Sequence, residues 1–206
     1  MSVSRETLIS TYFNERQKEV ARYAEILATW GIERGLVGPK EGDRIWDRHI
    51  ANCIPVTTLI SKEASLLDIG SGAGLPGIVI ALARPDLRVT LLEPLQRRID
   101  FLEEVVAELG IEISIKRGRA ETFKGGFNYV TARAVAPLPK LATVSWHLVM
   151  AGGSLLAMKG DSAAAELEAA RLEVPKVFKK VASAQIHEIT LGELPLARVI
   201  ELKKAG

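Results

Sequence analysis

The sequence lacks the features of a secreted or membrane-spanning protein. Of its 206 residues only Cys53 is a cysteine, which excludes an internal disulfide and fits a reducing compartment. No apolar run reaches the ~18 residues that cross a bilayer, and the longest candidate is residues 75–83. Charged side chains interrupt the early apolar positions, so no signal peptide is predicted. We expect a cytoplasmic protein with no membrane partner.

Strong charge of one sign is also missing. The net charge is +2, and residues 1–63 hold nine Lys/Arg against nine Asp/Glu, so there is no basic tail. A surface for RNA would have to be assembled by folding from scattered residues. No Cys and His residues lie at zinc-ligand spacing, so no metal is expected. Cys53 fits a small buried apolar residue better than a reactive thiol.

The most informative stretch is residues 66–77, Leu-Leu-Asp-Ile-Gly-Ser-Gly-Ala-Gly-Leu-Pro-Gly. Its apolar start suits a buried parallel strand, and its alternate glycines form a turn before a helix at residues 76–83. Glycine lets a ligand approach the backbone closely. Open α/β sheets bind nucleotides where a strand's carboxyl end meets a helix's amino end. The loop therefore predicts an adenosine-type cofactor.

Two cofactors compete for this loop. Residues 72–77 fit the dinucleotide pattern G-x-G-x-x-G, with Glu93 about 20 residues further on. Residues 68–74 fit the D-x-G-x-G-x-G loop of S-adenosylmethionine-dependent methyltransferases. A pyrophosphate prefers helix N–H groups without a nearby anion. S-adenosylmethionine carries a sulfonium, an ammonium and no phosphate, so Asp68 favours the methyl donor.

The first part of the chain is predicted to be helical. Apolar residues recur at helical spacing over residues 4–30, which predicts one or two amphipathic helices with Ser4 as the amino cap. Short helices are expected at residues 41–48 and 50–61, with Pro55 as a boundary or kink. Residues 1–63 thus form a helical extension before residues 64–206, within one structural domain overall.

From residue 64 the pattern becomes βα alternation. Strands are predicted at residues 64–69, 88–93, 111–115, 127–132 and 153–159, and helices at residues 76–83, 95–109, 137–150 and 161–172. Residues 181–189 and 196–202 then alternate apolar and polar side chains around a turn, as in an antiparallel pair. Five βα units and a terminal hairpin are the order of class I methyltransferases. The predicted fold is α/β, Rossmann-like, with a mostly parallel sheet and a helical extension.

Polar residues follow the strands at the predicted active-site rim. Glu93 ends the second strand, where a carboxylate can accept two ribose hydroxyls. Residues 119–121, Arg-Ala-Glu, follow the third strand and would hold an adenine edge or form a surface ion pair. Arg133 after the fourth strand suits an anion, either a methionine carboxylate or an RNA phosphate. Lys159 has the equivalent place after the fifth strand, and His49 suits an RNA contact or a capping role.

These motifs together carry a family resemblance. They are Arg48-His49-Ile50, Asp68–Gly77 with its Gly-Leu-Pro-Gly ending, Leu91-Leu92-Glu93, Arg119-Ala120-Glu121, Arg133-Ala134 and Met158-Lys159-Gly160. The whole chain resembles the bacterial 16S ribosomal RNA guanine-N7 methyltransferase family, also called the glucose-inhibited division protein B family. The resemblance implies cofactor contacts at Gly70, Leu75, Ala120, Glu121 and Arg133. The chain departs from the family pattern at Gly35, Asn52 and Cys53, all in the helical extension.

The predicted activity is methyl transfer from S-adenosylmethionine to N7 of a guanine in 16S ribosomal RNA, either naked or within the small subunit or an assembly intermediate. N7 has a lone pair and no proton, so no acid or base residue is expected. An enzyme acting on an exocyclic amine would show an Asn/Asp-Pro-Pro-Tyr motif, which Thr131-Ala132-Arg133-Ala134 lacks. The alternatives are a methyltransferase acting on a small molecule or another RNA, and an NAD-binding Rossmann module.

The predicted site residues fall into two groups. The cofactor-binding group is Asp68, Gly70, Gly72, Gly74, Leu75, Glu93, Ala120, Glu121 and Arg133. The group that faces RNA is Arg48, His49, Arg119, Arg133 and Lys159.

Overall fold

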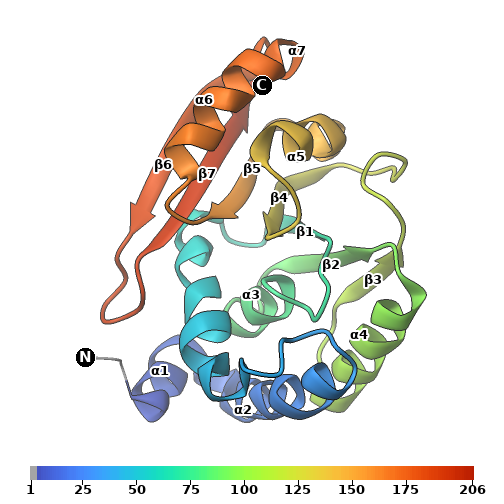
Figure 1. The fold of residues 1–206 in the computed structure, drawn as a ribbon, viewed down its shortest axis with the longest axis vertical. Coiled ribbons are helices and arrows are strands. Elements are labelled where there is room, and N and C mark those ends of the chain that lie inside the picture. Colours follow the sequence, from blue (N-terminus) through green and yellow to red (C-terminus); the bar gives the residue numbers. More distant parts are fainter. Residues whose placement is uncertain (1–3) are drawn as a thin grey trace.

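The computed structural model describes residues 4–206, which form a seven-stranded sheet covered by helices on both faces (Figure 1). The strand order is β3-β2-β1-β4-β5-β7-β6, with β7 antiparallel to both of its neighbours. The strands are β1 (Ser65–Ile69), β2 (Arg88–Glu93), β3 (Ser114–Arg117), β4 (Phe127–Arg133), β5 (Val149–Lys159), β6 (Val181–Ile189) and β7 (Ala197–Lys204). This is the predicted sheet with its terminal antiparallel hairpin.

The helices follow the strands with one exception. They are α3 (Gly77–Ala83), α4 (Gln96–Leu109), α5 (Leu138–Ser145), α6 (Ala163–Glu173) and the short α7 (Pro175–Phe178). The helix α4 ends at Gly110, whose φ of 60° is left-handed, as is common at a helix's carboxyl end. Residues 118–126 between β3 and β4 are a loop, so the prediction of five βα units is wrong at the third strand.

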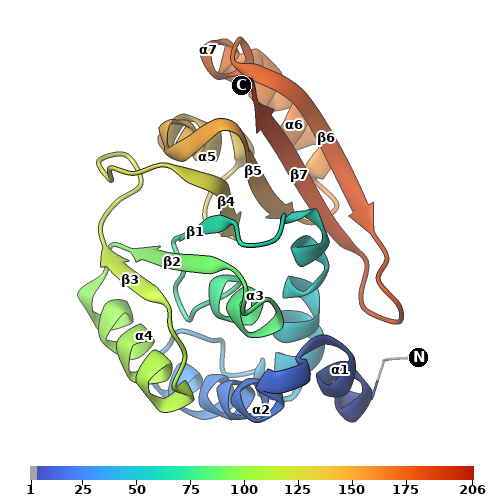
Figure 2. The same cartoon turned by 180° about the vertical axis from the view of Figure 1, so that it is seen from behind.

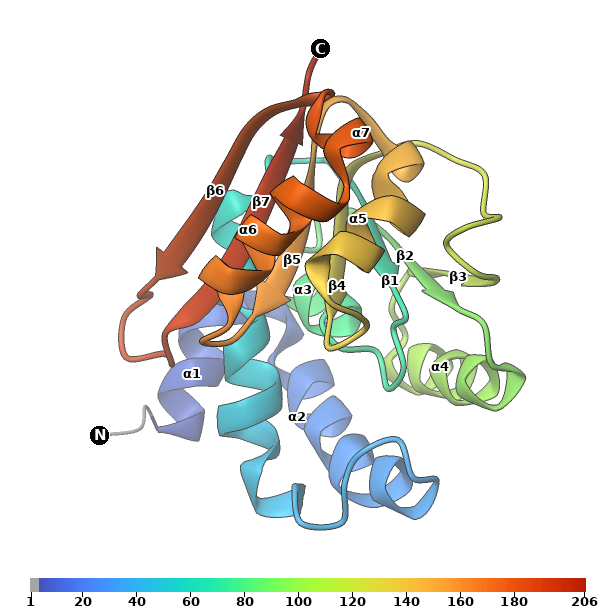
Figure 3. The same ribbon diagram turned by 45° about the horizontal axis from the view of Figure 1, so that its top comes forward.

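Apolar side chains make two cores, one on each face of the sheet. Helices α3, α4 and the residues before β1 (residues 4–63, the front segment) cover one face, and helices α5 and α6 cover the other, as Figure 3 shows. The sheet interior is apolar on both faces, since Leu66 and Leu67 of β1 point to opposite sides and are both fully buried. Such continuous burial is the mark of parallel strands that helices cover on both sides.

The front segment begins with α1 (Arg5–Tyr12), capped by Ser4 as predicted, and continues with α2 (Gln17–Ile26). Residues 42–59 follow as consecutive short helical turns, with Pro55 starting the last of them. Figure 2 shows α1 and α2 beside α3 and α4 on the same side of the sheet. The side chains of the front segment belong to the same apolar core as α3 and β2, so they pack as part of the domain.

Within residues 4–206, no helix combines the length and apolarity that crossing a bilayer requires.

Candidate functional site

The carboxyl ends of β1, β2, β4 and β5 meet at one edge of the sheet, because these strands are parallel and in close register. Asp68 of β1 lies beside Leu91 of β2 and Thr131 of β4, and Arg133 pairs with Met158 of β5. Two adjoining cavities open at this edge, and both are lined by Val135 and Ala136. The sequence predicts one active-site rim at this edge, and the structure has two neighbouring cavities there.

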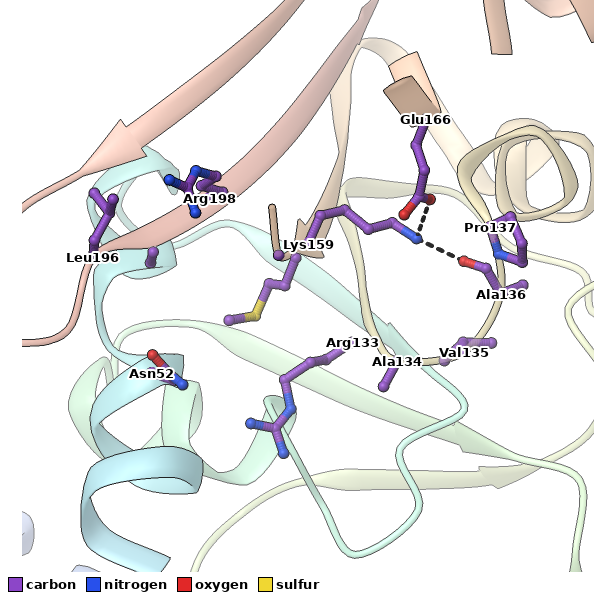
Figure 4. A pocket seen from close by; sticks show the side chains of 13 residues that line it. Asn52, Arg133, Ala134, Val135, Ala136, Pro137, Lys159, Glu166, Leu196 and Arg198 are labelled. Carbon is purple, nitrogen blue, oxygen red and sulfur yellow. Dashed lines mark hydrogen bonds and ion pairs between the residues drawn. The ribbon is translucent and has the colours of Figure 1, made fainter. Parts of the chain in front are cut away.

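The larger cavity has a volume of about 550 Å³ and lies between β4, β5, β7 and the front segment (Figure 4). Its polar lining comes from Asn52, Arg133, Lys159, Glu166 and Arg198. Its apolar lining comes from the loop after β4 and from Met158, Leu196 and Ala197.

The smaller cavity has a volume of about 180 Å³ and lies over the ends of β1, β2 and β3. Its lining includes Gly70 and Leu92 at the strand ends, residues 119–121 after β3, and Lys140, Leu141 and Val144 of α5. Ala120 is buried, whereas Arg119 and Glu121 are exposed. The chamber is mostly apolar, which suits a heterocycle such as adenine.

The glycine loop is held by two buried carboxylates. Glu93 at the end of β2 accepts the Gly72 N–H with Oε2 at 3.0 Å and the Leu95 N–H with Oε1 at 3.1 Å. Asp68 accepts the Gly77 N–H with Oδ2 at 3.1 Å and thereby fixes the start of α3. Both carboxylates have no exposed surface. The predicted cofactor-binding acids therefore lie beneath the loop and set its shape.

Asp68 differs from Glu93 in having an oxygen to spare. Its Oδ1 is buried and has no hydrogen-bond partner among the described residues. Burial raises the pKa of the Asp68 carboxyl to about 7. A cationic donor beside Oδ1 would give this oxygen its missing hydrogen bond. It would also supply a counter-charge that stabilises the buried carboxylate.

Glycine is required at two positions of the loop. Gly70 has a φ of 66°, and a Cβ there would lie 2.8 Å from Cγ2 of Val135. Gly74 has a φ of 98°, and a Cβ there would lie 2.9 Å from the hydroxyl of Tyr23. Both conformations are costly for other residues, so the loop can only be built from glycine here. Leu75, the next predicted contact, is buried behind the loop.

The loop after β4 separates the two cavities. Ala134 has a φ of 56°, a left-handed conformation that costs a residue with a Cβ free energy. This turn brings the Val135 side chain over Gly70, with 41% of it exposed. Val135 thus stands between the chamber over β1–β3 and the chamber over β4–β5.

Lys159 holds this loop from the side of β5. Its ammonium donates to the Ala136 carbonyl at 2.7 Å and pairs with Glu166 of α6, also at 2.7 Å (Figure 4). Glu166 also accepts the N–H of Leu138, the first residue of α5. Although burial opposes it, the Lys159 ammonium and the Leu138 N–H hold the pKa of Glu166 below its usual value. Lys159 lines the larger cavity as predicted, with its charge already paired.

Arg133 and His49 come together although 84 residues separate them. Arg133 Nη2 lies 3.0 Å from His49 Nδ1, and Nη1 lies 3.4 Å from the Arg48 carbonyl. On its far side, His49 Nε2 lies 3.0 Å from Oε2 of Glu41. The predicted RNA-facing residues Arg48 and His49 thus neighbour the predicted cofactor residue Arg133. Arg119 lies apart from them, at the smaller cavity.

Three polar residues of this site escaped the sequence analysis. Glu41 binds His49, Glu166 binds Lys159, and Arg198 lines the larger cavity with ion pairs to Asp161 and Glu188. Glu41 lies in a loop, Glu166 in α6 and Arg198 in β7 of the hairpin. None of them follows a parallel strand, which is where the sequence predicts the site residues. Cys53, next to the cavity residue Asn52, is fully buried, and burial raises the pKa of its thiol to about 11. Its burial accords with a packing role.

The residues present fit an S-adenosylmethionine-type cofactor. The fit rests on the unpartnered Oδ1 of Asp68 for an ammonium, on the side-chain-free cradle at Gly70 and Gly72, and on the mostly apolar chamber beside Ala120. A pyrophosphate fits less well, because Asp68 and Glu93 lie directly beneath the loop.

Comparison with known proteins gives consistent matches. A family model described as "GidB: rRNA small subunit methyltransferase G" matches residues 16–193. A ribosomal RNA small subunit methyltransferase G from Mycobacterium sp. (strain KMS) is 46% identical over 201 residues, covering 94% of this chain and 88% of the relative. That of Thermobifida fusca is 52% identical, covering 82% of this chain and 73% of the relative. For that of Kineococcus radiotolerans, at 51% identity, the match covers 79% of this chain and 65% of the longer relative.

Solved structures match in fold. A methyltransferase from Pyrococcus furiosus superposes with a TM-score of 0.61 at 15% identity, covering 94% of this chain and all of that one. PigF, solved with SAH, superposes with a TM-score of 0.62 at 18% identity, covering 97% of this chain and 71% of that one. At these identities the likeness is one of fold, and it is the fold of class I methyltransferases.

Proposed function

Since the chain belongs to the GidB family, rRNA small subunit methyltransferase G, we propose that it transfers a methyl group from S-adenosylmethionine to N7 of a guanine in small-subunit ribosomal RNA. The observation that carries the proposal is the family match over residues 16–193, which includes the smaller cavity, the loop between the cavities and the larger cavity's lining except for residues 196–198. The reaction takes place in the cytoplasm, where ribosomal subunits are assembled.

The smaller cavity and the glycine loop would hold the methyl donor, which supplies an electrophilic methyl group on its sulfonium. Asp68 Oδ1 would accept the ammonium of the methionine end, and the backbone at Gly70, Gly72 and Gly74 would allow its close approach. Glu93 would accept ribose hydroxyls, because an ionised carboxylate offers about four lone pairs and its hydrogen bonds to Gly72 and Leu95 occupy two.

The remaining predicted residues would act around the two chambers. Ala120 and Glu121 would border the adenine, with Arg119 outermost. Arg133 would bind an anion, either the methionine carboxylate or an RNA phosphate. Lys159 would maintain the wall between the chambers through its bonds to Ala136 and Glu166.

The larger cavity would take the target guanine. N7 carries a free lone pair, so attack on the methyl group releases no proton and needs no general base. The protein's contribution is then alignment of the two reactants, which is worth about 7–11 kcal/mol where the geometry is close to that of the reaction. Arg133 also suits a phosphate that flanks a guanine in RNA, since it has no carboxylate partner among the described residues, whereas Lys159 and Arg198 are ion-paired.

The test is methylation with purified protein. We would incubate it with methyl-labelled S-adenosylmethionine and either naked 16S ribosomal RNA or small subunits, then digest the RNA and identify the labelled nucleoside by mass spectrometry. The expected product is 7-methylguanosine, and the better of the two RNA forms identifies the substrate. Label in another nucleoside would refute the N7 assignment. Transfer to neither RNA, with turnover of a small molecule instead, would favour the small-molecule alternative.

A further inference from the structure

Arg133 is the last link of a chain of polar contacts that begins in the front segment. Glu41 Oε2 contacts His49 Nε2 at 3.0 Å, and His49 Nδ1 contacts Arg133 Nη2 at 3.0 Å. The second oxygen of Glu41 pairs with Arg48 at 3.1 Å, and the Arg48 carbonyl accepts from Arg133 Nη1 at 3.4 Å. Two contacts from the front segment, one through His49 and one through the Arg48 carbonyl, thus meet at the guanidinium of Arg133 in β4.

The chemistry of these groups decides where the proton of His49 lies. A guanidinium can only donate hydrogen bonds, so Nδ1 of His49 must accept. A neutral imidazole then carries its proton on Nε2, which donates to the Glu41 carboxylate. Burial and the Arg133 charge lower the pKa of His49 below its usual value, against the opposing effect of Glu41, and so favour this neutral form.

We propose that Glu41 and His49 are positioning residues that hold the Arg133 guanidinium at the mouth of the larger cavity, oriented for an anionic group of cofactor or substrate. This proposal rests on the proposed function, which places the reaction at that mouth. A free arginine side chain loses rotamer entropy when it is immobilised. Holding it in advance removes part of that loss from the binding step.

The arrangement predicts a dependence on pH. Protonated His49 has no lone pair on Nδ1 and repels Arg133, so Arg133 is held above the His49 pKa and released below it. The charged groups that face His49 are Glu41 and Arg48 from its own segment and Arg133 from β4. Behind Arg133 lie Asp68 of β1, Tyr23 of α2 and Cys53, which interact electrostatically with the same guanidinium.

The first experiment tests the chain of contacts from Glu41 through His49 to Arg133, called the relay below, in the protein without ligand. Imidazole ¹⁵N chemical shifts of His49 should show the tautomer protonated at Nε2 and a pKa below 6.5. Glu41→Gln should lower that pKa further, because it removes the carboxylate that favours the imidazolium. A tautomer protonated at Nδ1, or a pKa that Glu41→Gln leaves unchanged, would overturn the proposal.

The second experiment reads its consequence in methyl transfer to ribosomal RNA at saturating cofactor. We expect Glu41→Ala to lower kcat/KM at least tenfold, and Glu41→Gln, which keeps an acceptor for Nε2–H, to restore most of the loss. His49→Asn, whose amide oxygen replaces Nδ1 without titrating, should remove the acidic limb that His49 contributes to the pH profile. Asp43→Asn removes an exposed carboxylate of the same segment and serves as the matched control.

Two further readouts separate the possible partners of Arg133. A weaker cofactor Kd in Glu41→Ala identifies a carboxylate, and a higher KM for RNA identifies a phosphate. If neither changes in a Glu41→Ala protein that melts like the wild type, the relay does not position Arg133. If the wild type transfers no methyl group to RNA, the proposed function fails, while the ¹⁵N measurement and the cofactor Kd still decide the relay.

Discussion

Asp68 and Glu93 are both fully buried beneath one glycine loop, yet their oxygens are used differently. Both oxygens of Glu93 accept backbone N–H groups, whereas Asp68 leaves Oδ1 without a partner. An unpartnered buried carboxylate oxygen costs free energy unless the group is protonated or meets a cation. The state of Asp68 therefore depends on pH and on the ligand.

At this scale we predict a specific pH dependence of stability. The Asp68 pKa is about 7 in the folded protein, above its usual 3.8, so the folded state binds the proton more tightly. The wild type should therefore gain stability relative to Asp68→Asn as the pH falls from 7 to 5.5, by about 2 kcal/mol, and should show no further change above pH 8. Urea unfolding of both proteins at each pH measures the difference. A difference that stays constant would show that Asp68 is not held in this way.

Helix α3 packs closely against strands β1 and β2 at its first residue. Gly77 begins α3, and a Cβ there would overlap the Leu91 side chain of β2 and lie 2.8 Å from Oδ2 of Asp68. The helix start can thus approach the strands closely enough for the Gly77 N–H to reach Asp68. Gly77 is therefore a packing glycine between helix and sheet.

At the scale of elements we predict the effect of filling that contact. Gly77→Ala should lower the unfolding free energy by about 1–3 kcal/mol, although alanine is the better helix former. Gly160→Ala is the control, since a Cβ there meets no atom within 4 Å, and it should stay within about 0.5 kcal/mol of the wild type. Denaturant unfolding measures both. Equal stability of the two variants would contradict the close packing of α3.

Across the whole molecule, the front segment supports the cofactor loop through one buried side chain. Tyr23 of α2 is fully buried, and its hydroxyl donates to the Ala73 carbonyl in the glycine loop at 2.8 Å. Burial also raises the Tyr23 pKa well above its usual value, which keeps the phenol a donor. Helix α2, which precedes the first strand in the sequence, thus stabilises the glycine loop through this hydrogen bond.

At this scale we predict that removing the hydroxyl of Tyr23 affects cofactor binding, whereas removing that of Tyr12 does not. Tyr23→Phe should lower the unfolding free energy by about 1–2 kcal/mol, because the Ala73 carbonyl loses its donor, and should weaken cofactor binding several-fold. Tyr12→Phe removes a similar bond, from α1 to the Leu191 carbonyl in the β6–β7 turn, and should leave the cofactor Kd unchanged. Calorimetry measures both affinities. A Tyr12→Phe effect on affinity as large as that of Tyr23→Phe would show that the coupling is not local to the loop.

The sequence predicts best those features that depend on residues adjacent in the chain. The bounds of β2 and β6 and the Ser4 cap agree with the structure, because apolar alternation and capping depend on neighbouring residues. The strand β3 begins at Ser114 instead of residue 111 and ends at Arg117 instead of residue 115. It is a mostly exposed edge strand, so its apolar pattern is weak. The short helix α7 escaped prediction because four residues carry little periodicity.

By itself the sequence determined the type of cofactor loop, the order of strands and the placement of Glu93, Arg133 and Lys159 at strand ends. Those properties follow from backbone preferences and from the period of apolar residues along the chain. Only the tertiary structure decided that Arg133 meets His49, that Lys159 meets Glu166, and that Val135 divides the site into two cavities. The reason is physical: which charges pair depends on the directions of side chains brought together by packing, and no local pattern encodes a contact between residues 84 positions apart.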